Sequence, residues 1–252
     1  MNLVKDFYRR EEGLRRLIRD LSREPDALML DVGCRKGEIT RTLAEDKRFV
    51  AAVDIRRFPE WQESSPRVAF ASADATALPF RDRTFDLVVS GECLQYVADW
   101  KRVLDEFRRV LKPEGRLVLS CPNGNRWIDW LDVYNLSLRV KRLLRPSAVR
   151  GRSLVRHVRP RRLLLHQSGE WHCEKFLRRG SLGFIYASWM IDNLQNVRMR
   201  LASRAGPARR MAAGCLRHLI RMLCVGMRLD FMLALGGLSY NAVYSFRKKP
   251  VA

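Results

Sequence analysis

Short runs of apolar residues recur along the first half of the chain and alternate with amphipathic stretches. The apolar runs span residues 27–32, 49–55, 68–73, 85–90 and 115–121. The stretches between them place apolar residues at helical spacing, most clearly at Val103, Leu104, Phe107, Val110 and Leu111. Continuous apolar runs are typical of strands buried on both faces, and strands that alternate with helices form parallel sheets. The pattern therefore predicts a doubly wound α/β fold.

After residue 122 this rhythm ends. The later spacing predicts two helices, a strand, a long amphipathic helix and a closing strand, in that order over residues 127–138, 174–191, 196–202, 208–235 and 239–247. Helical spacing also predicts an N-terminal helix over 3–21 and a helix over 37–46.

Charge is distributed unevenly along the chain, whose formal net charge is +21. Residues 1–132 carry 24 basic and 23 acidic side chains, whereas residues 133–252 carry 24 basic and 4 acidic ones. A large basic surplus favours a polyanionic partner, either anionic lipid headgroups or nucleic acid. We expect a single domain over 1–252, in which a near-neutral core (28–121) supports a basic elaboration (123–238).

The composition excludes several classes of protein. Hydrophobic residues make up 47% of the chain, which excludes wholesale disorder. The 6 cysteines are scattered without a CxxC pair, so we expect reduced thiols and no metal site. The sequence contains no stretch of about 18 uncharged apolar residues, so it predicts no membrane-spanning helix. The charged segment MNLVKDFYRREEG is not a signal-peptide pattern, and we expect a cytoplasmic protein.

Acidic residues and glycines follow the predicted strands. Asp31 and Gly33 end the first strand, Asp54 ends the second, and Asp74 follows the third. Doubly wound sheets bind ligands at the carboxyl ends of their strands. A glycine turn lets the backbone approach a ligand, and an acid after the second strand can accept hydrogen bonds from ribose hydroxyls. Asp74 is placed to accept from the amino group of an adenine, so the pattern predicts a nucleotide-like ligand.

Residues 28–121 resemble the class I S-adenosylmethionine-dependent methyltransferases, in particular the methyltransferase type 11 group. The matching segments are LMLDVGCRKGEIT, VAAVDI, ASADATALPFRDRTFDLVVSGECLQYV and DEFRRVLKPEGRLVLSCPN. The resemblance implies a Rossmann-like methyltransferase fold with a seven-stranded, mostly parallel sheet, whose last strand is antiparallel. Basic helical insertions would follow the core. The resemblance also implies S-adenosylmethionine as the cofactor.

The same resemblance implies roles for individual residues. The implied cofactor-binding residues are Asp31, Gly33, Cys34, Arg35, Gly37, Asp54, Ile55, Asp74, Ala75 and Ser90. Asp54 would bind the ribose, and Asp74 with Ala75 would bind the adenine. Ser90 and Glu92 would lie under the cofactor near the methyl group.

Two positions depart from the family pattern. Glycine usually stands where this chain has Arg35, and Glu-His often stands where it has Gln95-Tyr96. A positive φ at Arg35 would cost about 1 kcal/mol, whereas its guanidinium could pair with the carboxylate of the cofactor. The second departure removes a histidine from the expected floor of the active site.

Few residues could act as a base during methyl transfer. His172 stands where related methyltransferases often carry a histidine near the acceptor. Alternatively, His172 is a surface histidine or caps a helix. Tyr96 and Glu92 are the other catalytic candidates, as polar groups near the methyl. Aromatic residues after the fifth strand could line an apolar acceptor pocket or pack on the sheet, and they are Trp127, Trp130 and Tyr134.

The predicted helix 208–235 has a basic stripe beside an apolar face. The stripe consists of Arg210, Arg217, Arg221 and Arg228, and the face includes Leu219, Ile220 and Leu223. This combination is typical of a helix at a membrane interface. A helix that covers the sheet and points arginine at water gives the same pattern. RNA is the rival partner, although the basic stretch 139–162 contains no Phe, Trp or Tyr to stack on bases.

These observations predict methyl transfer from S-adenosylmethionine to a small or lipid-linked acceptor, with an anionic membrane surface as a candidate partner. The protein would be cytoplasmic or peripheral on the inner face of the membrane. Two alternatives stay open. One is an RNA methyltransferase, and the other is a non-catalytic partner protein that keeps the fold, for which Arg35 is the best support.

Overall fold

The structure is a computed structural model of the chain. The residues it describes are 27–44, 49–62, 65–122, 133–144, 163, 169, 171–179, 190, 194, 197–198, 211–212, 214–220, 222 and 241–249. The chain divides into two compact units. The helical unit consists of residues 1–8, 123–155 and 178–241, and the sheet unit consists of residues 9–122, 156–177 and 242–252.

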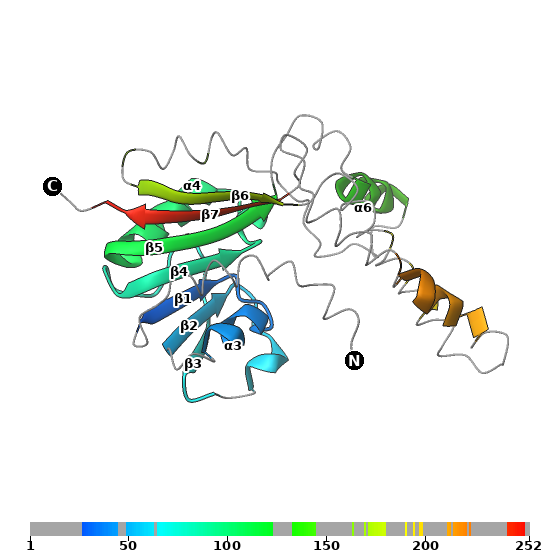
Figure 1. The fold of residues 1–252 in the computed structure, drawn as a ribbon, viewed down its shortest axis with the longest axis horizontal. Helices are drawn as coiled ribbons and strands as arrows, with labels where there is room; N and C mark the ends of the chain where they lie inside the picture. The colour runs from blue at the N-terminus through cyan, green and yellow to red at the C-terminus, as the bar shows by residue number, and fades with distance from the viewer. Residues whose placement is uncertain are drawn as a thin grey trace. The chain divides into compact units, whose positions relative to one another are not determined.

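Seven strands form one sheet in the order β3-β2-β1-β4-β5-β7-β6 (Figure 1). Their bounds are β1 Leu28–Val32, β2 Phe49–Asp54, β3 Val68–Ser72, β4 Phe85–Gly91, β5 Leu111–Pro122, β6 Trp171–Arg179 and β7 Asn241–Lys248. The pairs β1–β2, β1–β4, β2–β3 and β4–β5 are parallel, and β7 runs against β5 and β6 in Figure 1. The expected doubly wound, mostly parallel sheet is confirmed.

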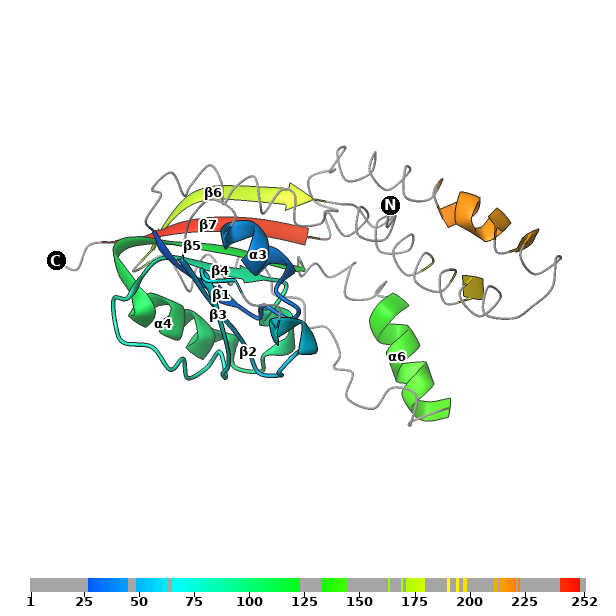
Figure 2. The same cartoon turned by 90° about the horizontal axis from the view of Figure 1, so that it is seen from below.

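Helices cover both faces of this sheet (Figure 2). The helices on the two faces are α3 Glu38–Ala44 and α4 Trp100–Val110. The sheet unit also contains the 3-10 turns η2 Pro59–Gln62 and η3 Leu94–Tyr96, and the helical unit contains α6 Val133–Leu144. Neighbouring residues of β1 belong to different faces: Met29 packs in the cluster that contains Leu43 of α3, and Leu30 packs in the cluster that contains Phe107 of α4. Because both faces are buried, the strands are continuous apolar runs.

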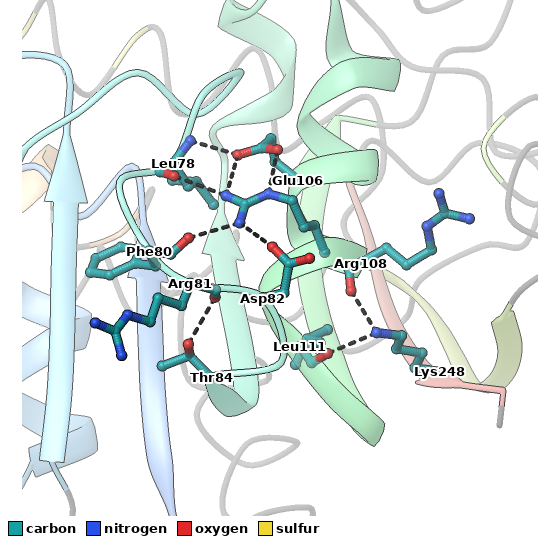
Figure 3. A network of polar contacts seen from close by, with 10 residues as sticks. Leu78, Phe80, Arg81, Asp82, Thr84, Glu106, Arg108, Leu111 and Lys248 are labelled. Carbon is teal, nitrogen blue, oxygen red and sulfur yellow. Dashed lines mark hydrogen bonds and ion pairs between the residues drawn. The ribbon is translucent and has the colours of Figure 1, made fainter. Parts of the chain in front are cut away.

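The last strand is fastened to the junction between α4 and β5. Lys248 of β7 is 8% exposed, and its Nζ donates hydrogen bonds of 2.8 Å to the carbonyls of Arg108 and Leu111 (Figure 3). Burial lowers the pKa of this lysine. These bonds satisfy carbonyls where the helix ends, so they secure the closing strand that the sequence predicts at 239–247.

β6 replaces the first part of a predicted helix. Helical spacing predicts a helix from Glu174 onward, but residues 171–179 form an edge strand of the sheet. Trp171 lies edge-on to Phe246 with ring centroids 6.2 Å apart, and Phe176 stacks on Tyr244 at 4.9 Å. These contacts with β7 outweigh the local helical spacing, because strand formation depends on packing against neighbours. The helix prediction is therefore wrong at 174–179.

The remaining elements beyond residue 122 are described in part. Residues within the predicted helix 208–235 are helical wherever the structure describes them, at 211–212, 214–220 and 222. Val197 and Arg198 are also helical, so the strand predicted over 196–202 is wrong at these two residues. The predicted helix 3–21 lies outside the described residues. Among the described residues, no helix is long and apolar enough to cross a bilayer.

Candidate active site

The turn between β1 and α3 requires glycine at two positions. Gly33 has φ +80° and Gly37 has φ +81°. A Cβ at Gly33 would lie 2.7 Å from the Cβ and Sγ of Cys93, and a Cβ at Gly37 would lie 2.5 Å from Cζ of Phe70. The backbone N–H groups of Gly33 and Cys34 both donate to the carbonyl of Val53. The turn therefore packs against β2, β3 and the loop after β4, and neither glycine position has room for a side chain.

Arg35 adopts a left-handed conformation in the middle of this turn. Its φ is +48°, which costs about 1 kcal/mol for a residue with a β-carbon. Its N–H donates to Asp54 Oδ2 over 3.0 Å, and its carbonyl accepts from Nε1 of Trp61 over 2.6 Å. These two bonds hold the strained backbone. The side chain is exposed, so the guanidinium is accessible to a ligand at the turn.

The segment after β2, which contains η2, contacts the turn between β1 and α3. Nζ of Lys36 forms an ion pair of 2.7 Å with Oε1 of Glu60 in η2, and this hydrogen bond lowers the pKa of Glu60. Arg41 of α3 donates to the carbonyl of Glu60. The Trp61 ring stacks on Phe70 at 5.3 Å. η2 therefore fixes the path of the turn.

Asp31 is a support beneath the turn. It is 1% exposed, and its Oδ2 accepts a hydrogen bond of 2.6 Å from Oγ1 of Thr40 in α3. Cys34 is also buried, at 6% exposure, and burial raises the pKa of its thiol. The structure therefore brings both residues to the turn but covers their side chains, so the surface of the turn is formed mainly by its backbone and by Arg35.

The acid at the end of β2 is oriented by backbone amides. Asp54 Oδ2 accepts from Arg35 N, and Asp54 Oδ1 accepts from Arg56 N over 3.0 Å. Each carboxylate oxygen has two lone pairs, so each keeps one for a further donor. Ile55 follows directly and is 71% exposed. An oriented carboxylate thus stands beside an open apolar surface, which suits a sugar diol and an attached base.

Asp74 lies in the loop after β3, where its carboxylate closes a local turn. Its Oδ1 accepts from both N and Oγ1 of Thr76, each over 2.8 Å, and these bonds lower the pKa of Asp74. The half-buried Ala75 lies next to it. The N–H of Ala73 donates to the carbonyl of Asp54, which joins the ends of β2 and β3. Asp74 and Ala75 are therefore brought to the same edge of the sheet as Asp54.

One arginine of α4 holds the loop that carries Asp74, and Figure 3 labels its partners Leu78, Phe80, Asp82 and Glu106. Arg109 donates to the carbonyls of Leu78 and Phe80 over 2.9 and 2.7 Å. It also pairs with Glu106 and Asp82, with nearest N–O distances of 2.8 and 2.7 Å. Oε2 of Glu106 in turn accepts from the N–H of Leu78 over 2.7 Å. Hydrogen bonds and ion pairs therefore join the loop after β3 to α4.

A polar clamp lies where β4 and β5 end. Glu92 follows β4 with φ +54°, and its N–H donates to the carbonyl of Ser120 in β5. Its Oε1 accepts from Oγ of Ser120 over 3.1 Å, and its Oε2 accepts from Nε2 of Gln95 over 3.0 Å. Ser120 and Gln95 are 5% and 2% exposed. Two buried donors thus set the orientation of a half-buried carboxylate.

The other candidates on β4 and η3 differ in exposure. Ser90 is fully buried within β4, whereas Tyr96 at the end of η3 is 53% exposed. Burial raises the pKa of Cys93 to about 12, so this thiol stays protonated near neutral pH. Among the described residues, no group of His, Cys, Asp or Glu is arranged to hold a metal ion.

The structure does not bring His172 to this site. His172 is exposed and is the second residue of the edge strand β6. Glu174, two residues later, contacts Arg116 in the middle of β5, and Ser120 follows Arg116 by four residues. At about 3.3 Å per residue, His172 lies about 20 Å from Ser120 along the strands. This placement gives no support to a role for His172 in the chemistry.

Sequence reasoning missed two parts of the site. Ser120 is an ordinary strand residue in its own segment, and only the register between β4 and β5 places it opposite Gly91 and beside Glu92. Trp61 lies in the segment PEWQ, and its contact with Arg35 depends on how the loop after β2 folds back, which the sequence does not reveal. The aromatic acceptor pocket expected from Trp127, Trp130 and Tyr134 falls on side chains outside the described residues.

Part of the chain matches the model of a known protein family. Residues 30–119 match the family model described as a methyltransferase domain. The human protein named arginine-hydroxylase NDUFAF5, mitochondrial, is 35% identical over 101 residues, which cover 39% of this chain and 29% of that protein. Demethylmenaquinone methyltransferase of Beutenbergia cavernae is 31% identical over 121 residues, 47% of this chain and 50% of that protein. The chain thus spans half or less of the length of these relatives.

Solved structures share the fold. Phosphoethanolamine N-methyltransferase 2 of Haemonchus contortus, in complex with S-adenosyl-L-methionine, superposes with a TM-score of 0.57 at 15% identity. The superposition covers 95% of this chain and 53% of that chain. The likeness confirms the Rossmann-like architecture seen in the strand order.

Proposed function

We propose that this chain, whose residues 30–119 are a class I S-adenosylmethionine-dependent methyltransferase domain, transfers the methyl group of S-adenosylmethionine to a small or lipid-linked acceptor. One observation carries the proposal. Asp54 ends β2, and Asp74 and Glu92 follow β3 and β4, so the three acids lie at the carboxyl ends of parallel strands, as does the turn after β1 with its two positive-φ glycines. Carboxyl ends of parallel strands meet at one edge of the sheet, where doubly wound folds bind their ligands.

The residues at this edge fit the cofactor. Asp54 presents a carboxylate already oriented by the amides of Arg35 and Arg56, and its remaining lone pairs suit two ribose hydroxyls. Ile55 offers an exposed apolar surface for the adenine ring, and Asp74 can accept from the adenine amino group. The exposed guanidinium of Arg35 is placed to pair with the carboxylate of the methionine part.

S-adenosylmethionine supplies a methyl group that its sulfonium charge already activates. The chain therefore has to hold an acceptor in line, and proximity provides most of the rate enhancement. Glu92 is suited to this task because Ser120 and Gln95 fix both of its carboxylate oxygens at the end of β4. Its carboxylate would accept a hydrogen bond from an N–H or O–H of the acceptor and so orient the nucleophilic atom. Tyr96, exposed nearby in the chain, is a second candidate for contact with the acceptor.

Two observations favour a small or lipid-linked acceptor. A relative that covers nearly half of this chain is named demethylmenaquinone methyltransferase. The second half of the chain carries 24 basic and 4 acidic side chains, which suits an anionic membrane surface from which such an acceptor could be drawn. The same charge distribution supports the proposal that the protein is cytoplasmic, or peripheral on the inner face of the membrane.

The positive φ of Arg35 favours a second candidate function. Strain at the turn where glycine usually stands fits a chain that keeps the fold without catalysis. Cofactor binding separates the two candidates.

A methyl-transfer assay tests the proposal. The full chain is incubated with methyl-labelled S-adenosylmethionine and cell extracts separated into lipid, RNA and small-molecule fractions. Label should enter the lipid or small-molecule fraction and be lost with the Asp54→Ala variant. Label confined to RNA would favour an RNA methyltransferase. Absence of any transfer together with absence of cofactor binding would favour the non-catalytic candidate.

A further inference from the structure

The apolar side chains of α6 that the structure describes are exposed. Leu136, Val140, Leu143 and Leu144 are 57%, 47%, 84% and 72% exposed. At about 100° per residue, these side chains fall within an arc of about 100° on the helix surface. The helix therefore carries an apolar stripe on its exposed side.

Arginines flank this stripe on one side. Arg139 lies about 40° beyond the edge of the apolar arc and Arg142 about 100° beyond it, at the same helical spacing, and both side chains are exposed. A helix that covered the sheet would bury its apolar residues and expose its basic ones. Every α6 side chain that the structure describes is exposed, including the most apolar ones. The described side chains of α6 therefore form an exposed surface with an apolar stripe.

The helical residues near the C-terminus repeat the arrangement. Met211, Leu219 and Met222 are 73%, 45% and 73% exposed, and the exposed Cys215 shares their side of the helix. Ile220, on the opposite side, is 4% exposed and packs inside the protein. This helix thus has one apolar side against the protein and another without a partner among the described residues.

We infer that the exposed apolar sides of α6 and of helical residues 211–222 dock on an anionic membrane surface. The inference rests on the proposed function for its purpose, the capture of a lipid-linked acceptor, but its physical basis is separate. Aliphatic and methionine side chains insert into the headgroup boundary, and adjacent arginines pair with lipid phosphates. Charge complementarity supports this partner, because residues 133–169 carry 10 basic side chains and no acid. Among the side chains of these helices that the structure describes, the exposed apolar ones include no aromatic ring that could stack on RNA bases.

Flotation of the full chain with lipid vesicles tests the inference. The probes are phosphatidylcholine vesicles with and without phosphatidylglycerol, at low and high salt. The chain should float with the anionic vesicles and at least about 25-fold less with the neutral ones, and high salt should weaken binding. Changing Leu143→Ser with Leu144→Ser should reduce binding about tenfold or more. Changing Arg139→Gln with Arg142→Gln should reduce it about 25-fold at low salt, since each basic side chain contributes about fivefold.

Matched variants of the sheet unit provide the control. Phe49→Ser removes an apolar side chain that is 54% exposed on β2, and Arg57→Gln with Arg81→Gln removes two exposed charges. These variants should bind vesicles within about twofold of the parent chain. Circular dichroism and calorimetry with S-adenosylmethionine should show that all variants keep the fold and the cofactor site.

Three outcomes would overturn the inference. The parent chain could ignore anionic vesicles at low salt, the α6 variants could bind as well as the parent, or the control variants could lose as much binding as the α6 variants. If the α6 variants lost binding to structured RNA but kept vesicle binding, the surface would serve RNA and the inference would be wrong. Vesicle binding without cofactor binding would support the surface while contradicting the proposed function.

Discussion

The backbone N–H of Arg35 donates a hydrogen bond of 3.0 Å to the carboxylate of Asp54. This bond joins the glycine turn after β1 to the acid at the end of β2. The carbonyl of Arg35 accepts from Trp61 over 2.6 Å, so the left-handed residue is held on both sides. The residue that departs from the family pattern thus orients the acid proposed to bind the ribose.

This arrangement predicts the effect of Arg35→Gly. Glycine keeps the N–H that bonds to Asp54 and relieves the strain of the positive φ, so the fold should keep its stability within about 1 kcal/mol. If the guanidinium pairs with the carboxylate of S-adenosylmethionine, affinity should fall at low salt, and the loss should shrink as salt rises. Calorimetry at two salt concentrations measures both. Tighter binding by Arg35→Gly would show that the side chain hinders the cofactor.

The clamp around Glu92 predicts a loss of turnover without a loss of cofactor affinity. Ser120→Ala and Gln95→Leu each remove a buried donor to the carboxylate, and a hydrogen bond to a charged group contributes about 1.5–3 kcal/mol. Methyl transfer into the fraction that accepts label should fall about tenfold in each variant, with an unchanged dissociation constant for S-adenosylmethionine. Ser245→Ala, a change in β7 away from the clamp, is the control. Full turnover in both clamp variants would remove Glu92 from the mechanism.

The network of Arg109 predicts a coupled loss of stability and cofactor binding. Arg109→Gln breaks bonds to the carbonyls of Leu78 and Phe80 and to Glu106. Since the network is partly exposed, we expect the free energy of unfolding to fall by about 1–3 kcal/mol. Cofactor affinity should fall too, because the same loop carries Asp74. Urea titration and calorimetry measure the two effects, with the exposed neighbour Lys101→Gln as the control. A stable variant with normal affinity would contradict the network's role.

Acid should weaken the same network. The hydrogen bonds from Arg109 hold the pKa of Glu106 below its usual range in the folded chain. A carboxyl with a depressed folded pKa stabilises the fold above its unfolded pKa of about 4.3, and this contribution is lost as the pH falls through the folded value. Glu106→Gln should therefore be less stable than the parent at neutral pH, and the difference should narrow below about pH 4.3. Urea titrations from neutral to acidic pH test this, and a difference that stayed constant with pH would contradict it.

Local pattern was sufficient to predict the core of the sheet and the residues at its carboxyl edge. Strands buried on both faces leave continuous apolar runs, and Asp54 and Asp74 follow such runs directly, so their common edge could be predicted from spacing. The positive φ at Arg35 was also foreseeable, because glycine usually stands there.

Contacts between distant segments could not be predicted in this way. Glu92 and Ser120 meet only through the register of β4 with β5. Residues 174–179 have helical spacing, yet Phe176 finds its partner in Tyr244, 68 residues later in the chain. Helical spacing on α6 was visible in the sequence, but whether its apolar side faces the protein or solvent depends on the tertiary structure.

Calorimetric titration with S-adenosylmethionine of the parent chain, Asp54→Ala and the exposed control Asp105→Ala decides whether Asp54 binds the cofactor. The parent and Asp105→Ala should bind alike. Asp54→Ala should bind about 30-fold more weakly, because two ribose hydroxyls lose a charged acceptor worth about 2 kcal/mol. Equal affinity in all three proteins, or no binding by the parent even at millimolar cofactor, would contradict the proposed methyltransferase site.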